Sequence, residues 1–237
     1  MISTIFAFIL GLVVLINVSC AQEGMGTRRD RRVVGGKRGI IEQYPYQVSL
    51  ELQGVHVCGG AILKSNWVIT AAHCFRYSRN GYTVRAGTST VMSDGSVHPV
   101  KDIILHDDTT QCGPHVHDVA LIRLEIPISF DKYRKPVKVL TKNNPLGVGT
   151  WANVTGWGLT ESEYQSVLGG LVPGQICAGF VDESVGGTCA ADGGAPLVSD
   201  GTLVGISSWA KSCGSPPAPG VYTDPTHYFA WIDRTIG

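Results

Sequence analysis

The sequence predicts an all-β protein, a sandwich or a barrel, on three observations. The chain is divided into short segments rich in Val, Ile, Thr and Trp, each bounded by Gly, Asn, Asp or Pro. Its 237 residues include 30 Gly and 12 Pro, which disfavours a helical bundle and favours many turns. Only one segment, the last, has a good helical pattern.

The expected elements follow one another without an internal repeat or a low-complexity linker, so we expect one continuous domain. In the C-terminal segment, Tyr228, Trp231 and Ile232 recur at i, i+3 and i+4, on one face of a helix. The candidate strands are Gln47–Leu52, Val68–Thr70, Thr83–Gly87, Val97–His106, Asp118–Leu124, Ala152–Gly156, Leu203–Trp209 and Val221–Asp224.

An export signal and a propeptide are expected ahead of this domain. The apolar run from Ile5 to Val18 is short for a membrane span and suits a signal peptide, although no Lys or Arg precedes it. We assign residues 1–21 to the signal and 22–32 to a short activation propeptide. The basic stretch ending at Arg32, before Val33, is a candidate cleavage site, with a solvated linker as the alternative. The domain then spans 33–237, and a secreted, extracellular protein should form disulfides.

Charge and hydrophobicity exclude several classes of protein. The 19 Lys and Arg residues balance the 19 Asp and Glu residues, so the chain lacks the basic footprint of a nucleic-acid or anionic-membrane binder. A hydrophobic fraction of 43% is too high for a disordered chain. We therefore expect no nucleic-acid partner and no membrane attachment.

Three separated motifs carry residues capable of chemistry. They are Ala71-Ala72-His73-Cys74, the run that begins at Asp118, and Ala191-Asp192-Gly193-Gly194-Ala195-Pro196. Alone, each has an ordinary structural explanation. Their order is very specific when taken with Val33-Val34-Gly35-Gly36, Gly156-Trp157-Gly158 and Gly220-Val221-Tyr222. From Val33 to the C-terminus the chain resembles the secreted chymotrypsin-like serine proteases, the trypsin fold family, in an invertebrate form. The resemblance implies two six-stranded antiparallel β-barrels and a C-terminal helix.

The resemblance also assigns a catalytic site that lacks one member. His73 matches the general base and Asp118 the acid that orients it. Gly193 stands where the family has its nucleophilic Ser, and glycine has no oxygen to attack a carbonyl. In a comparable triad the loss of Ser alone costs on the order of 10⁶ in kcat. We expect the covalent mechanism to be absent, unless Gly193 reflects an error in the sequence.

Other site residues are assigned by resemblance only. No cofactor and no metal are expected. Gly187, at the base of the specificity pocket, offers no counter-charge, so an apolar side chain should fit better than Lys or Arg. The remaining assignments are Ala191 and Gly193 for the oxyanion hole, Arg32, Val33 and Asp192 for activation, and Ala210 and Gly220 for the pocket walls.

A shortened segment and the cysteines bear on the fold. Only 18 residues separate Gly158 from Cys177, fewer than in the family, so the second barrel should lack about one strand. Open strand edges invite pairing or aggregation. Either neighbouring segments close the gap, or the chain is marginally stable, or an exon is missing from the sequence. The resemblance implies the disulfides Cys58–Cys74 and Cys189–Cys213. It leaves Cys112 and Cys177 paired with each other, free, or bridged to another chain.

Two weaker patterns remain. Cys112, His115, His117 and Asp118 include metal-ligand types, but they lie in a predicted loop and Asp118 already has a role. The triplet Asn153-Val154-Thr155 fits an N-glycosylation acceptor, although a predicted strand is a difficult place for a glycan.

The preferred hypothesis is a secreted, monomeric protease homologue without catalytic activity, which binds a protein or peptide ligand. One alternative is an active trypsin- or chymotrypsin-like endopeptidase, if Gly193 is an error or activity survives it. The other is an unstable product of a decayed gene or of a wrongly assembled one.

Overall fold

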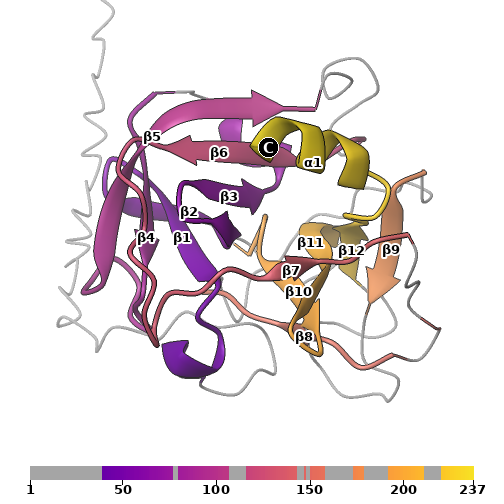
Figure 1. The fold of residues 1–237 in the computed structure, drawn as a ribbon, viewed down its shortest axis with the longest axis horizontal. Coiled ribbons are helices and arrows are strands. Elements are labelled where there is room, and N and C mark those ends of the chain that lie inside the picture. Colours follow the sequence, from indigo (N-terminus) through magenta and orange to yellow (C-terminus); the bar gives the residue numbers. More distant parts are fainter. Residues whose placement is uncertain are drawn as a thin grey trace, which may run out of the picture.

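The first half of the chain forms a closed barrel of six strands (Figure 1). The computed structural model describes residues 39–76, 80–106, 116–142, 147, 150–157, 173–178, 192–210 and 220–237. The barrel order is β1-β2-β3-β6-β5-β4, and every pair in it is antiparallel. Its strands are β1 (Gln47–Leu52), β2 (Val55–Lys64), β3 (Trp67–Thr70), β4 (Tyr82–Ala86), β5 (Ser96–Leu105) and β6 (Ala120–Leu124).

Alternating side chains and tight turns explain this barrel. In β4, Tyr82, Val84 and Ala86 are buried and their neighbours are half-buried, as expected where one face of a strand meets a core. Gln53 and Gly54 connect β1 to β2 with φ values of 52° and 79°. Two successive positive φ values fit the two-residue hairpin turn whose twist matches that of the strands. The register between β1 and β2 is thereby fixed.

The second half forms an antiparallel sheet in the order β8-β10-β11-β12-β9, with β7 added in parallel to β11. With β7 this sheet has six strands, and along the described residues its order is open. The shortened segment between Gly158 and Cys177 lies largely outside the described residues, so the expected loss of about one strand stays a prediction. Two short 3₁₀ turns, η1 (Ile41–Gln43) and η2 (Ala72–Phe75), and one helix complete the description. The strands are β7 (Lys138–Val139), β8 (Asn153–Val154), β9 (Gln175–Ala178), β10 (Pro196–Ser199), β11 (Thr202–Ala210) and β12 (Gly220–Thr223).

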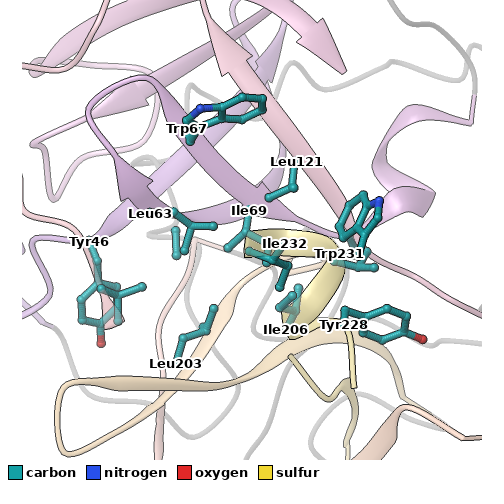
Figure 2. Packing of buried hydrophobic residues seen from close by; sticks show 14 of the residues in the cluster. Tyr46, Leu63, Trp67, Ile69, Leu121, Leu203, Ile206, Tyr228, Trp231 and Ile232 are labelled. Atoms are coloured by element: carbon teal, nitrogen blue, oxygen red, sulfur yellow. The ribbon is translucent and has the colours of Figure 1, made fainter. Parts of the chain in front are cut away.

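One hydrophobic cluster joins the two halves (Figure 2). It combines Ile69 and Leu121 of the barrel with Leu203 and Ile206 of β11, and all four are almost fully buried. Helix α1 (Phe229–Ile236) contributes Ile232 to the same cluster. Because both β units share this core, the loops at their junction are held in fixed relative positions.

The all-β prediction is confirmed, and each strand that it named is present. All eight expected strands are present with shifts of a few residues at their ends, and the expected apolar face of the C-terminal helix is buried at Trp231 and Ile232. The prediction missed β2, β7, β9 and β10. In the part of the chain that the structure describes, no helix is long and apolar enough to span a bilayer.

Candidate active site

The barrel brings His73 and Asp118 together although 45 residues separate them. His73 lies in η2, directly after β3, and Asp118 lies just before β6. These two strands pair antiparallel, with Thr70 opposite Ala120, so the end of one meets the start of the other. The local sequence therefore places both side chains at the same rim of the barrel.

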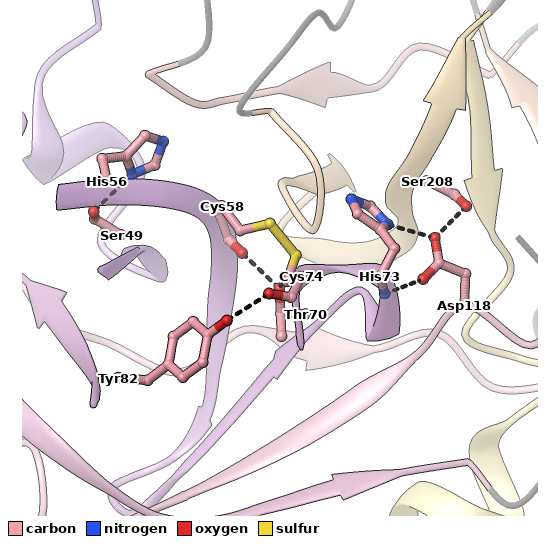
Figure 3. Close-up of a disulfide and its surroundings, with 10 residues drawn as sticks. Ser49, His56, Cys58, Thr70, His73, Cys74, Tyr82, Asp118 and Ser208 are labelled. Carbon is pink, nitrogen blue, oxygen red and sulfur yellow. Dashed lines mark hydrogen bonds and ion pairs between the residues drawn. A yellow bond between two sulfur atoms is a disulfide. The ribbon is translucent and has the colours of Figure 1, made fainter. Parts of the chain in front are cut away.

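Two hydrogen bonds fix the imidazole on the carboxylate (Figure 3). The backbone N–H of His73 donates to Oδ1 of Asp118 at 2.8 Å, and Nδ1 of the ring lies 2.8 Å from Oδ2. Ser208 Oγ, on β11, donates a further short bond to Oδ2. Since an ionised carboxylate only accepts hydrogen bonds, Nδ1 is the donor in this bond, and Nε2 is the ring nitrogen that faces away from Asp118. Asp118 is 2% exposed and His73 is 21% exposed, so only the base faces solvent.

A turn from the second sheet presents Gly193 to the free edge of this imidazole. A Cβ placed on Gly193 would overlap the ring, being 2.8 Å from Cε1 of His73 and nearer still to Nε2. It would also lie 3.5 Å from Sγ of Cys58. The imidazole therefore occupies the space that a side chain at residue 193 would need. The structure brings the three predicted catalytic positions together and leaves no hydroxyl at the third.

Backbone bonds hold this turn, and none of them needs a side chain at residue 193. Gly59 N–H donates to the Gly193 carbonyl at 2.8 Å, and Gly194 N–H donates to the Ser207 carbonyl at 2.7 Å. Gly194 has φ +75°, and a Cβ there would come within 2.6 Å of the Gly59 carbonyl oxygen. Only glycine fits such a position. The turn is thus pressed against β2 of the barrel.

The predicted disulfide Cys58–Cys74 is present and ties η2 to β2, with a Cα–Cα distance of 6.2 Å. Cys177 is an exposed free thiol in β9. The predicted pair Cys189–Cys213 and the remaining Cys112 lie outside the described residues.

The other predicted positions are described in part. Ala210 and Gly220 face each other at the adjoining ends of β11 and β12. Asp192 is fully buried, and its carboxylate lies so close to the Gly156 backbone that a Cβ there would overlap it. Arg32, Val33, Gly187 and Ala191 lie outside the described residues.

Sequence reasoning missed Ser208 as part of the site. Ser208 is buried, and its hydroxyl reaches Asp118 from the second β unit, 90 residues along the chain. The Thr223 hydroxyl, from β12, donates to the Asp118 carbonyl at 2.8 Å. Nothing in the spacing of these residues signals either bond, because both depend on how the two β units meet.

Of the four residues in the weaker metal pattern, the structure describes His117 and Asp118, and both have other partners. His117 Nδ1 lies 3.0 Å from the Tyr228 hydroxyl, and the Asp118 carboxylate holds His73. Among the described residues, Cys58, His73 and Cys74 bring metal-ligand types within 4.8 Å of one another. Both sulfurs are joined in the disulfide, so neither offers the thiolate that a metal ion would bind.

A closed β-barrel and a second β-sheet that share a core, with a His–Asp pair facing a tight glycine turn, define the class of chymotrypsin-fold serine protease domains. The chain's residues 33–232 match the family model Trypsin. The chain therefore belongs to the trypsin family of serine proteases.

Similar proteins support this assignment over most of the chain. Trypsin epsilon of Drosophila erecta is 34% identical over 95% of this chain and 98% of its own length. Trypsin 5G1 of Aedes aegypti is 35% identical (89% and 87%), and a vitellin-degrading protease of Bombyx mori is 32% identical (87% and 86%). Among solved structures, neuropsin, a serine protease expressed in mouse brain, superposes with a TM-score of 0.74 at 31% identity, over 86% of this chain and all of that one.

Proposed function

We propose that this chain is a secreted, monomeric, non-catalytic member of the trypsin family that binds a peptide or protein ligand. The observation that carries the proposal is that residue 193, which lies beside the imidazole of His73, is a glycine and offers no hydroxyl. Acyl transfer by this family needs a nucleophile within hydrogen-bond reach of the base. Residue 193 is a glycine beside the imidazole, so this position supplies no such nucleophile.

Loss of the nucleophile leaves much of the site architecture in place. The His73–Asp118 pair, the turn at Gly193 and the facing ends of β11 and β12 are all positioned by backbone bonds and core packing. A ligand can therefore be bound at this rim without being cut. By resemblance, Gly187 leaves the specificity pocket uncharged, so we propose that the ligand inserts an apolar side chain.

Cleavage after Arg32 and secretion are part of the same proposal. The apolar segment in residues 5–18 and the basic stretch before Val33 support it. A disulfide between Cys58 and Cys74 suits an oxidising compartment.

The test uses a fluorophosphonate probe, which labels only an activated serine hydroxyl. Four proteins are compared after removal of residues 1–32 by a site-specific protease: wild type, Gly193→Ser, the matched control Gly193→Ala, and Gly193→Ser combined with His73→Ala. We expect no labelling of the wild type. Labelling of Gly193→Ser alone among the variants would mean that the base, the acid and the turn are assembled and only the nucleophile is missing.

Covalent labelling of the wild-type protein at residues 192–195 would overturn the proposal and favour an active endopeptidase. Binding is tested separately with two peptides that differ only by Phe or Lys at one position. The apolar proposal predicts tighter binding of the Phe peptide. A preference for Lys would contradict it.

A further inference from the structure

The most exposed of the large hydrophobic side chains in the described residues is Trp151, which is 84% exposed. It is followed two residues later by Asn153, the first residue of the acceptor triplet Asn153-Val154-Thr155, and Asn153 is exposed as well. No other Asn-x-Ser/Thr triplet follows residue 21. An exposed apolar side chain is ordinary by itself, so what makes Trp151 informative is the acceptor triplet that lies two residues away on the same extended segment.

Alternation along this extended segment places both side chains on one face. Ala152 and Val154 pack against a buried cluster that includes Leu197 and Val204. Because successive side chains in an extended chain point to opposite faces, Trp151 and Asn153 point away from that cluster. The strand position therefore does not hide Asn153, and the expected difficulty of placing a glycan there does not arise.

The backbone around the two residues is well anchored. Asn153 and Val154 of β8 pair with Val198 and Leu197 of β10, and Ser199 Oγ donates to the Trp151 carbonyl at 2.8 Å. Residues two apart in an extended chain are separated by about 7 Å, which is close to the span of one sugar ring. A sugar linked to Asn153 thus has the indole of Trp151 within reach.

We propose that Asn153 carries an N-linked glycan whose first sugar packs its C–H face across the indole of Trp151. The indole offers a large, flat apolar surface, and a pyranose ring presents a face of C–H groups that is apolar although its edges are hydroxylated. The glycan covers the exposed tryptophan, and the tryptophan fixes the first sugar. One modification accounts for both exposed side chains.

The chemistry uses a lipid diphosphate-linked oligosaccharide as donor, supplied by the secretory pathway. Nδ2 of Asn153 forms a bond to the anomeric carbon of the first sugar. The bond between that carbon and the diphosphate oxygen breaks, and the lipid diphosphate leaves with the electron pair. One amide proton of Asn153 passes to a base of the transferase.

The hydrogen bond of Thr155 in the folded protein implies that the glycan is attached before folding is complete. The Thr155 hydroxyl is half-buried and donates to Oε1 of Gln47, on β1, at 2.6 Å. A transferase must engage the acceptor triplet in an extended, accessible form, so the sugar is added before the Thr155 hydroxyl bonds to Gln47. The proposal requires entry into the secretory pathway but does not rest on the catalytic status of residue 193.

The experiment begins with the full chain secreted from insect cells. Glycopeptide mass mapping uses a glycanase that tolerates core fucose, in ¹⁸O-labelled water, which marks each released site as ¹⁸O-Asp. We expect the mark at Asn153 in wild type and Thr155→Ser, and none in Asn153→Gln. Secreted, folded wild-type protein with an unmodified Asn153 would overturn the proposal.

A second measurement isolates the contact with Trp151. Wild type, Trp151→Ala and the aromatic control Trp151→Phe are each compared with and without their glycan, removed enzymatically from folded protein. We expect deglycosylation to lower the Tm of wild type and Trp151→Phe by about 2–4 °C, the shift that a contact worth about 1 kcal/mol produces in a chain of this size. The Tm of Trp151→Ala should not change. An equal decrease in all three would overturn the packing of the sugar on the indole.

Discussion

The substitution Gly193→Ala tests how closely the imidazole of His73 lies against residue 193. In Gly193→Ala, the new Cβ would lie 2.8 Å from Cε1 of His73, whereas relaxed carbon contacts are about 3.5–4.0 Å apart. The ring must therefore recede by about 1 Å. The ring is held by the bond between Nδ1 and Asp118, and the backbone N–H of His73 bonds to the same carboxylate, so the ring cannot recede freely. We expect Gly193→Ala to lower the free energy of unfolding by about 1–3 kcal/mol, the usual cost of overpacking.

Backbone strain does not contribute to this cost, because Gly193 is not among the glycines with positive φ. The matched control is Gly147→Ala, which also lacks a positive φ and whose Cβ would meet its nearest neighbour at 3.9 Å. We expect this control to be neutral or stabilising by up to about 1 kcal/mol, because alanine restricts the unfolded chain.

The decisive assay is a double-mutant cycle with His73→Ala, followed by urea denaturation. His73→Ala leaves Asp118 with the backbone N–H of residue 73 and the Ser208 hydroxyl, so the variant should fold, at a lower free energy of unfolding than wild type. With the ring gone, Gly193→Ala should behave like the Gly147→Ala control. If the two substitutions add within about 0.5 kcal/mol, the imidazole does not occupy that space and the reasoning fails.

Three further predictions concern the rest of the chain. Burial lowers the pKa of His98 below 6.5, so as the pH falls the unfolded chain binds a proton at His98 before the folded chain does. The free energy of unfolding should therefore fall as the pH drops below about 6.5. His98→Gln should flatten part of that slope in denaturation curves measured over a pH series. Replacing Cys58 and Cys74 by Ala should lower the free energy of unfolding by about 3 kcal/mol in the same assay, since their sequence separation is 16 residues. Partial burial raises the pKa of the Cys177 thiol, so the reactive thiolate fraction grows about tenfold from pH 7 to pH 8. Maleimide labelling of Cys177 in unreduced protein should accelerate by the same factor. Recovery of the Cys177 peptide in a disulfide would contradict the free thiol.

The sequence was sufficient to predict those strands whose pattern is local. β1 matches its predicted bounds, and β4 and β6 differ by one or two residues, because apolar alternation and flanking turns define them. The missed strand β2 contains Gly59 and Gly60, a residue type that is more common in turns than in strands. A Cβ on either would come within 2.9 Å of a neighbouring backbone atom, so these glycines serve close packing inside a strand. Such a requirement is set by the partner strand and leaves no local pattern.

In the candidate site, too, some residues could be predicted from local motifs and others could not. Motifs predicted His73, Asp118 and Gly193, and their spatial meeting follows from β3 pairing with β6 and from the turn before β10. The Ser208 bond to Asp118 and the exposure of Trp151 could not be predicted, because they depend on how the two β units dock and on which face of β8 meets the core.

The His73–Asp118 pair has a structural role that is independent of catalysis. Asp118 is almost fully buried, and its carboxylate is satisfied by the backbone N–H and ring of His73 and by Ser208. Removing a partner from a buried charge costs about 3–5 kcal/mol, a large share of the roughly 5–15 kcal/mol that holds a typical domain together. Residue 193 is different, because the backbone bonds that hold its turn need no side chain at this position. Residue 193 is thus the position of the site that the fold can most readily leave without a side chain, and the presence of the His73–Asp118 pair does not by itself indicate proteolysis.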